Sequence, residues 1–388
     1  MQKLLFIILT ALSVSSCTTD SIDRTLEFSA KQTLSLYRSV KDLDGRLPRS
    51  IDPSGQLVTS NDAYWCSGFT AGTLWYLYEY TACDSLKAAA EALTERIERQ
   101  QYNTGSHDVG FMIYCSSGNA YRLTSNPAYR DVILNAARSL STRFNPALGV
   151  IRSWDHLQWH FPVIIDNLMN LELLCEATRL SGDTSFLHIA VSHADTTMKY
   201  HFRPDGSSYH VVDYGVLQDG FPLRQTHQGC ADASAWARGQ AWALYGYTMM
   251  FRETKKPEYL AQAIKIANFI LNHPRLPADG IPYWDFDAPD IPNALRDASA
   301  GAIICSALIE LSAFADKNLA GKYLKAAEKQ IATLSSPEYL AETNTNGNFI
   351  LKHGVGNLPN RSEIDVPLTY ADYYFVEALI RYKKQNKS

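Results

Sequence analysis

The chain has 388 residues, 46% of them hydrophobic, and its 36 basic and 40 acidic residues give a formal net charge of −4. This length and apolar content are ample for a large core. The mild negative charge gives no electrostatic reason to expect nucleic acid or an acidic membrane surface as a partner, so an anionic ligand would need a local basic site.

The N-terminus has the pattern of an export signal. Lys3 precedes an apolar run over residues 4–12, and Val14-Ser15-Ser16-Cys17 follows, which is typical of a bacterial lipoprotein signal. The apolar run is about half the roughly 20 residues that a transmembrane helix needs. We therefore expect residues 1–16 to be a signal peptide, Cys17 to be the lipidated N-terminus and residues 17–23 to be a tether. A cleaved secretory signal with an incidental cysteine is the alternative.

This pattern predicts an exported bacterial lipoprotein of the periplasm or outer membrane, whose only membrane contact is the lipid anchor. It does not say which membrane face carries the anchor. Six cysteines follow Cys17, without any Cys-x-x-Cys pair and with mostly apolar or small neighbours. They are typical of buried free thiols rather than of a metal site, although one disulfide in an exported chain stays open.

Apolar residues at helical spacing recur throughout the rest of the chain, and no Pro/Gly/Ser-rich linker divides it. The spacing predicts twelve helices, at 24–41, 67–82, 84–101, 108–117, 127–143, 161–180, 184–202, 232–252, 257–273, 295–315, 319–335 and 366–384. Strand-like alternation is limited to short pieces at 207–214 and 348–352. We expect an all-α fold in which residues 24–388 form one domain. Six successive hairpins favour an (α/α)6 barrel with a central pocket, and a solenoid is the alternative.

In the predicted helix at 161–180, Pro162 fits the first turn and Asp166 lies among Val, Ile and Leu side chains. A carboxylate in such surroundings is costly unless it is paired or protonated. Asp166 is therefore either a structural acid bonded to backbone donors or an arginine, or a tuned carboxyl in a pocket. In the second case Asp108, in the segment His107-Asp108-Val109-Gly110-Phe111, is its natural partner. Paired acids beside tryptophans point to carbohydrate chemistry.

The segment from Thr226 to Trp242 reads T-H-Q-G-C-A-D-A-S-A-W-A-R-G-Q-A-W. Asp232 is expected to cap a helix, which places Arg238 and Trp242 on one helical face. A guanidinium fork and indole faces suit a sugar acid, so we expect Arg238 and Trp242 to bind ligand rather than to hold the fold. The alternative is a core helix whose arginine bridges to a nearby acid.

Four ordered segments resemble the signatures of the unsaturated glucuronyl hydrolases, glycoside hydrolase family 88. They are His-Asp-Val-Gly-Phe at 107–111, Ile-Asp-Asn-Leu-Met-Asn at 165–170, Thr-His-Gln-Gly at 226–229 and Trp-Ala-Arg-Gly-Gln-Ala-Trp at 236–242. The likeness runs from Tyr64-Trp65 to the segment at 370–375. It implies an (α/α)6 barrel that acts on oligosaccharides ending in a 4,5-unsaturated uronic acid, the product of polysaccharide lyases.

The resemblance also implies roles for individual residues. Asp166 would be the general acid/base and Asp108 its essential partner. The positions that would line the sugar-acid site are Trp65, His210, Gln228, Arg238 and Trp242. The family chemistry delivers a proton to C4 of the vinyl ether and water to C5, after which the hemiketal opens. The resemblance implies no metal and no organic cofactor.

Three other functions are alternatives. An unsaturated rhamnogalacturonyl hydrolase would share fold and chemistry, a polysaccharide lyase would use a Tyr or His base, and a lipid-anchored glycan-binding protein would need neither acid. The source polymer also stays open among heparan, chondroitin and hyaluronan fragments, as do linkage, sulfation and oligomeric state.

Overall fold

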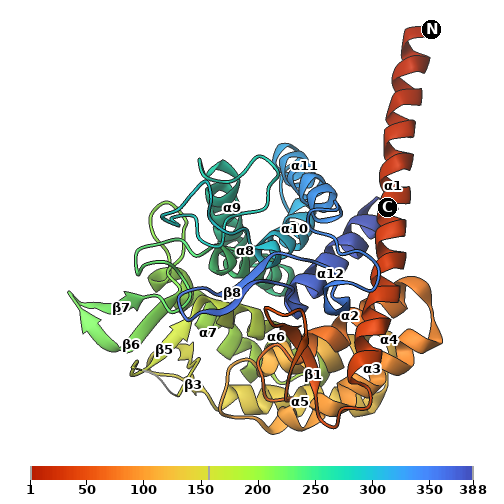
Figure 1. Ribbon diagram of the computed structural model, residues 1–388. Coiled ribbons are helices and arrows are strands. Elements are labelled where there is room, and N and C mark those ends of the chain that lie inside the picture. The colour runs from red at the N-terminus through yellow and green to blue at the C-terminus, as the bar shows by residue number, and fades with distance from the viewer. Residues whose placement is uncertain (1, 156–157, 387–388) are drawn as a thin grey trace.

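The computed structural model describes residues 2–155 and 158–386 (Figure 1). Helices dominate these residues. The α-helices are α1 (Gln2–Val40), α2 (Gly68–Thr81), α3 (Asp84–Ile97), α4 (Asn119–Thr124), α5 (Pro127–Ser141), α6 (Leu171–Ser181), α7 (Thr184–Tyr200), α8 (Ala237–Thr254), α9 (Pro257–Asn272), α10 (Ala298–Ser312), α11 (Lys317–Leu334) and α12 (Thr369–Gln385). Tighter or wider helical turns are η1 (Glu98–Tyr102), η3 (Ile165–Asn170) and η4 (Asn346–Asn348), which are 3₁₀, and η2 (Gly110–Gly118), which is a π-helix.

The helices form two concentric rings. The inner ring consists of α2, η2 with α4, α6, α8, α10 and α12, each packed on the next, and α12 closes the ring against α2. The outer helices α1, α3, α5, α7, α9 and α11 each pack on an inner neighbour. Burial follows this order: every residue of inner α10 except Glu310 is buried, whereas outer α11 buries a single stripe. The predicted all-α (α/α)6 barrel is confirmed.

The two ends of the barrel differ in their connections. Two to four residues lead from each inner helix to the next outer helix, as at Ala82 and Cys83 between α2 and α3. The connections from outer to inner helices are long and contain all the described strands. Each long connection ends at the N-terminus of an inner helix, so the long connections together surround one mouth of the barrel.

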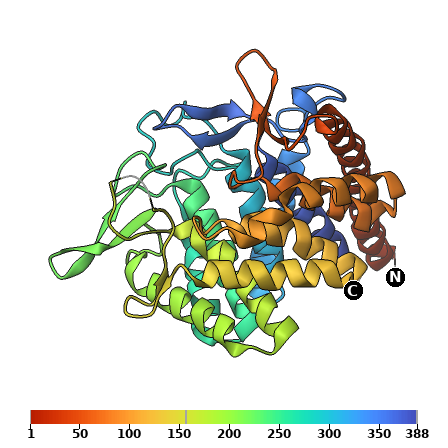
Figure 2. The same ribbon diagram turned by 90° about the horizontal axis from the view of Figure 1, so that it is seen from below.

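Four small antiparallel sheets stiffen these long connections. They are β1 (Leu47–Ile51) with β2 (Leu57–Ser60), β3 (Phe144–Asn145) with β4 (Val150–Ile151), β5 (Pro162–Ile164) with β6 (Val211–Gln218) and β7 (Phe221–Gln225), and β8 (Gly354–Asn357) with β9 (Ser362–Val366). The β1–β2 and β8–β9 hairpins lie on the same side of the molecule, and the β6–β7 hairpin projects from the body (Figure 2).

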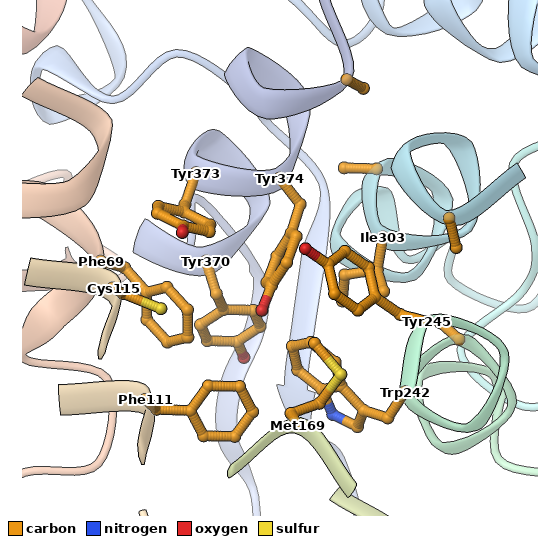
Figure 3. Packing of buried hydrophobic residues seen from close by; sticks show 14 of the residues in the cluster. Phe69, Phe111, Cys115, Met169, Trp242, Tyr245, Ile303, Tyr370, Tyr373 and Tyr374 are labelled. Carbon is orange, nitrogen blue, oxygen red and sulfur yellow. The ribbon is translucent and has the colours of Figure 1, made fainter. Parts of the chain in front are cut away.

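Aromatic rings fill the barrel centre just beneath this mouth (Figure 3). The ring of Phe111 lies 5.3 Å from that of Phe69 and 5.1 Å from that of Trp242, and Trp242 in turn lies 5.4 Å from Tyr374. Such tilted and edge-on pairs add to the stabilisation from burial. The packed rings form a rigid layer that supports the polar groups at the mouth.

Two parts of the predicted secondary structure are wrong. Residues 161–180 are not one helix, because the β-branched residues Val163 and Ile164 pair with Val212 and Val211 in β6 before the chain turns into η3 and α6. Pro162 is therefore a strand residue and not part of a first helical turn. The predicted strand at 348–352 is also absent: Asn348 ends η4, and Leu351 makes only an isolated bridge to Leu340.

The N-terminal segment is helical from Gln2 and continues without a break into the part of α1 that packs on the barrel. Its first turns extend beyond the body of the molecule (Figure 1). Within residues 2–155 and 158–386, no helix is long and apolar enough to cross a membrane. The side chain of Cys17 lies outside the part of the chain that is described, so the signal-peptide and tether boundaries stay predictions.

Candidate active site

A cavity of about 90 Å³ opens at the barrel mouth and is lined by Trp65, Asp108, Trp154, Ile164, Asp166, Gln228 and Arg238. Five of these seven residues are the ones that the sequence motifs indicated. They come from four separate connections and one inner helix, so the closed ring is what brings them together. Trp154 and Ile164 were not predicted, and only the proximity of Trp154 to the 161–170 segment could have suggested it.

Asp166 lies in η3, directly after strand β5, and only 7% of it is exposed. Burial raises the pKa of its carboxyl to about 7, Arg238 opposes that rise, and the negative charge of Asp108 adds to it. The nearby indole N–H of Trp242 also lowers this pKa, although it makes no hydrogen bond of normal geometry to a described residue. No described group hydrogen-bonds to Asp166 Oδ2. The carboxyl is therefore a tuned acid with a free oxygen at the cavity, rather than an acid satisfied by the fold.

Asp108 lies in the turn that leads into the π-helix η2, where its carbonyl accepts the Met112 N–H at 2.9 Å. Its Oδ2 accepts the hydroxyl of Ser106 at 2.9 Å, and its Oδ1 lies 3.3 Å from Nε2 of the buried His107. Burial lowers the pKa of His107, so this imidazole is neutral at pH 7. Asp108 thus accepts a hydrogen bond from Ser106 and lies beside a neutral imidazole whose Nε2 makes no hydrogen bond to a described residue.

His210 precedes β6 and is buried beside Asp166. Its Nδ1 accepts the backbone N–H groups of His227 at 3.0 Å and Gln228 at 3.1 Å, so this nitrogen carries no proton. Burial lowers the pKa of His210 well below its usual value, and the charges of His227, Arg238 and His201 act in the same direction. The neutral ring therefore bears its proton on Nε2, which lies 3.8 Å from Asp166 Oδ2.

Arg238 is the second residue of α8 and is only 1% exposed. Its Nη1 donates to Asp297 Oδ2 at 3.0 Å, further donor groups reach the carbonyls of Val355 and Gly356, and its guanidinium lies over the ring of Trp236. Because Asp297 also caps α10, Arg238 ties three segments together. It lines the cavity as expected, but it also holds the fold through an acid, as the alternative core-helix interpretation predicted.

The remaining predicted residues divide into two groups. Trp65 and Gln228 line the cavity, and Gln228 Nε2 is additionally held by the carbonyl of Gly356 at 3.0 Å. Trp242 is fully buried in the aromatic layer, so only its indole edge is directed towards Asp166. A direct contact of Trp242 with substrate stays a prediction.

The helix that carries Arg238 starts later than expected. It begins at Ala237, with Trp236 in an extended conformation before it. Asp232 does not cap it, because its Oδ1 instead accepts the Thr226 N–H at 2.8 Å and closes the preceding loop. The described residues include no group of three or more His, Cys, Asp or Glu that could hold a metal ion.

A larger hollow of about 310 Å³ lies at the opposite end of the barrel, around Arg252 and Arg381. Its arginines are already paired with acids of the inner helices, Arg252 with Glu172 and Glu310, and Arg381 with Glu310 and Glu377. These pairs close the base of the ring, whereas in the 90 Å³ cavity Oδ2 of Asp166 has no hydrogen-bond partner among the described residues.

Residues 41–385 match the model of Glycosyl Hydrolase Family 88. The chain belongs to glycoside hydrolase family 88. This confirms the resemblance drawn from the four motifs. A curated relative from Formosa agariphila, an unsaturated glucuronyl hydrolase, is 48% identical over 87% of this chain and 84% of its own length. An unsaturated chondroitin disaccharide hydrolase from Streptococcus pyogenes is 32% identical over 87% of this chain and 86% of its own length.

Solved structures of this glycoside hydrolase family have the same barrel. A crystal structure of an unsaturated glucuronyl hydrolase specific for heparin superimposes with a TM-score of 0.89 at 48% identity, covering 94% of this chain and 98% of that one. The unsaturated glucuronyl hydrolase of Bacillus sp. GL1, described as responsible for glycosaminoglycan degradation, gives a TM-score of 0.85 at 29% identity, with coverage of 93% and 97%.

Proposed function

We propose that this chain is an unsaturated glucuronyl hydrolase, which releases the 4,5-unsaturated uronic acid from the non-reducing end of glycosaminoglycan-type oligosaccharides. The observation that carries the proposal is the Asp166 carboxyl, buried at the barrel mouth with a pKa of about 7 and with one oxygen unpartnered. At pH 7 about half of the molecules hold the proton that the first step needs, and the carboxylate that this step leaves can act as the base in the next step.

In the proposed reaction Asp166 gives its proton to C4 of the C4=C5 vinyl ether, which leaves positive charge shared between C5 and the ring oxygen. The Asp166 carboxylate then removes a proton from water as the water oxygen bonds to C5. The product is a hemiketal, which opens and expels the rest of the oligosaccharide. Asp108 contributes by disfavouring the ionised form of Asp166 before the first step, because like charges repel at short range.

The other groups at the mouth have supporting roles in this proposal. His210 presents an Nε2–H towards Asp166, which can hold the carboxylate during the water step. Arg238, Gln228 and Trp65 line the same cavity, and they offer a positive charge, an amide and a flat apolar face to the sugar acid.

The names of the relatives support the substrate class. The most informative is the heparin-specific hydrolase at 48% identity, and chondroitin disaccharide hydrolases follow at 32%. We therefore propose heparin-type unsaturated disaccharides as the first substrates to test. Fragments that differ only in linkage or sulfate position should be compared at equal concentration. The measurement is the loss of the enoate absorbance.

The same assay separates the alternatives. Gain of absorbance on intact polymer would mean a lyase, and binding without any change would mean a glycan-binding protein. Faster turnover of unsaturated rhamnogalacturonan fragments than of glycosaminoglycan fragments would mean that the chain is an unsaturated rhamnogalacturonyl hydrolase. Asp166→Asn should lack turnover on every substrate, which guards against a contaminating enzyme.

We also propose that the chain is exported and lipid-anchored through Cys17, because residues 4–17 have the pattern of a lipoprotein signal. Fractionation of cells that express the full chain should place it with membranes, and Cys17→Ser should release it or leave its precursor unprocessed. Equal distribution of both proteins would contradict the anchor without affecting the enzymatic proposal.

A further inference from the structure

The two carboxylates of the cavity lie on different elements, and one buried side chain joins these elements. Asp108 leads into η2, Asp166 lies in η3, and η2 packs against η3. Asn170, the last residue of η3, is completely buried at this contact.

The Asn170 amide uses both of its ends across the contact. Its Oδ1 accepts the backbone N–H of Phe111 at 2.8 Å, a donor in the first turn of the π-helix that has no helical partner. Its Nδ2 lies 3.4 Å from Nδ1 of His107, whose Nε2 lies 3.3 Å from Asp108 Oδ1. When Nδ2 donates, the neutral His107 keeps its proton on Nε2, which lies beside Asp108 but has no hydrogen-bond partner among the described residues.

Gly110 makes the contact close. A methyl group at this position would lie 2.4 Å from Asn170 Oδ1 and 2.6 Å from Asn170 Cα. Real Cβ atoms do not approach so near, and the clash involves backbone, so any side chain at Gly110 would force η2 and η3 apart. The distance between η2 and η3 is therefore set by Gly110, which has no side chain, on the η2 side and by the Asn170 amide, which hydrogen-bonds through both its oxygen and its nitrogen, on the η3 side.

We propose that Asn170 and Gly110 are positioning residues that set the separation and orientation of Asp108 relative to Asp166. Neither touches the cavity, so both act through the two acids. This inference rests on the proposed function only for its catalytic meaning, because the spacing itself is a property of the fold.

The proposal has a measurable electrostatic consequence. The charged or titratable groups that face Asp166 are Asp108 from the η2 side, Arg238 from α8 and His210 from the segment before β6. Of these, only Asp108 is attached to η2. Moving η2 away weakens the repulsion from Asp108, and so lowers the pKa of Asp166, while Arg238 and His210 stay in place.

Two chemically unrelated variants should therefore act in the same direction. Gly110→Ala keeps every polar group and adds bulk, whereas Asn170→Ala keeps the packing of Gly110 and removes both hydrogen bonds. In each, the Asp166 carboxyl should titrate lower by about half a pH unit or more, and kcat should fall about 10-fold to 100-fold with a smaller change in KM.

The titration is followed by NMR of aspartate carboxyl carbons in the labelled full chain, with Asp166→Asn identifying the signal. The control is Asn119→Ala. Asn119 is another buried amide between inner helices, bonded to the Cys115 carbonyl at 3.0 Å and the Tyr373 hydroxyl at 3.2 Å, but near the other end of the barrel. It should lower the melting temperature without moving the Asp166 titration. If Asn170→Ala does not fold, Asn170→Ser takes its place.

An unchanged Asp166 titration in both the Gly110 and Asn170 variants, with only a lower melting temperature, would overturn the inference and leave these residues purely structural. The failure of the proposed function looks different. In that case the wild type turns over no unsaturated disaccharide, while the carboxyl titrations still decide whether Asn170 and Gly110 set the spacing.

Discussion

Asp166→Asn should make the protein less active and, at alkaline pH, more stable. The variant keeps the shape of the side chain but loses the transferable proton and the buried negative charge. A carboxyl with a pKa of about 7 is half protonated at pH 7, whereas at the ordinary value of 3.8 about one molecule in 1,600 would be. Burial therefore raises the acid-competent fraction by about 800-fold, and we expect turnover of the variant to fall by about 10²–10⁴.

The stability change follows from the same shift. The folded-state pKa of Asp166 lies above its unfolded value, so its contribution to stability is fully present below about pH 4 and is lost as the pH rises to 7. A shift from 3.8 to about 7 corresponds to roughly 4 kcal/mol of destabilisation at pH 8 and about 1–2 kcal/mol at pH 5. The asparagine variant avoids this penalty because it cannot ionise.

Urea unfolding of both proteins at pH 5 and pH 8 is the assay. The free energy of unfolding of Asp166→Asn, relative to wild type, should rise by about 2–3 kcal/mol between the two pH values. Glu172 and Asp372, whose pKa values burial also raises to about 7, are present in both proteins and cancel in the comparison. A difference that does not change with pH would refute the raised pKa, and near-normal turnover would refute the catalytic role.

Two further predictions concern Arg238 and the reaction itself. Arg238→Ala should lower the free energy of unfolding by about 3–5 kcal/mol, because Asp297 would be left buried and without its charged partner. The same variant should also have a lower kcat/KM. Urea unfolding and kinetics measured together test this, and an unchanged free energy of unfolding would contradict it. Wild-type enzyme in heavy water should place deuterium at C4 of the released keto sugar, as mass spectrometry can show, whereas product without C4 label would exclude hydration of the double bond.

The class of fold and the two acids at the cavity could both be predicted from the amino-acid sequence. Apolar spacing at 257–273 and 319–335 predicted α9 and α11 to within about two residues, because a helix that buries one stripe repeats its apolar side chains every three to four positions. Asp166 stood out because a carboxylate among β-branched and apolar residues needs an explanation, and Asp108 stood out through its motif. Local pattern was enough for both conclusions.

The pairing of the buried polar groups could not be predicted, because it depends on the folded chain as a whole. The segment at 161–170 is a strand and a 3₁₀ turn because β6, almost 50 residues later, pairs with it. Arg238 finds Asp297 59 residues away and Gly356 118 residues away, and the proton of His210 is placed by backbone amides of the loop before α8. The periodicity of apolar residues in the sequence indicates which face of a helix or strand is buried. The partner of a buried charge depends on which distant segments the closed ring brings to one mouth, and that is a property of the whole chain.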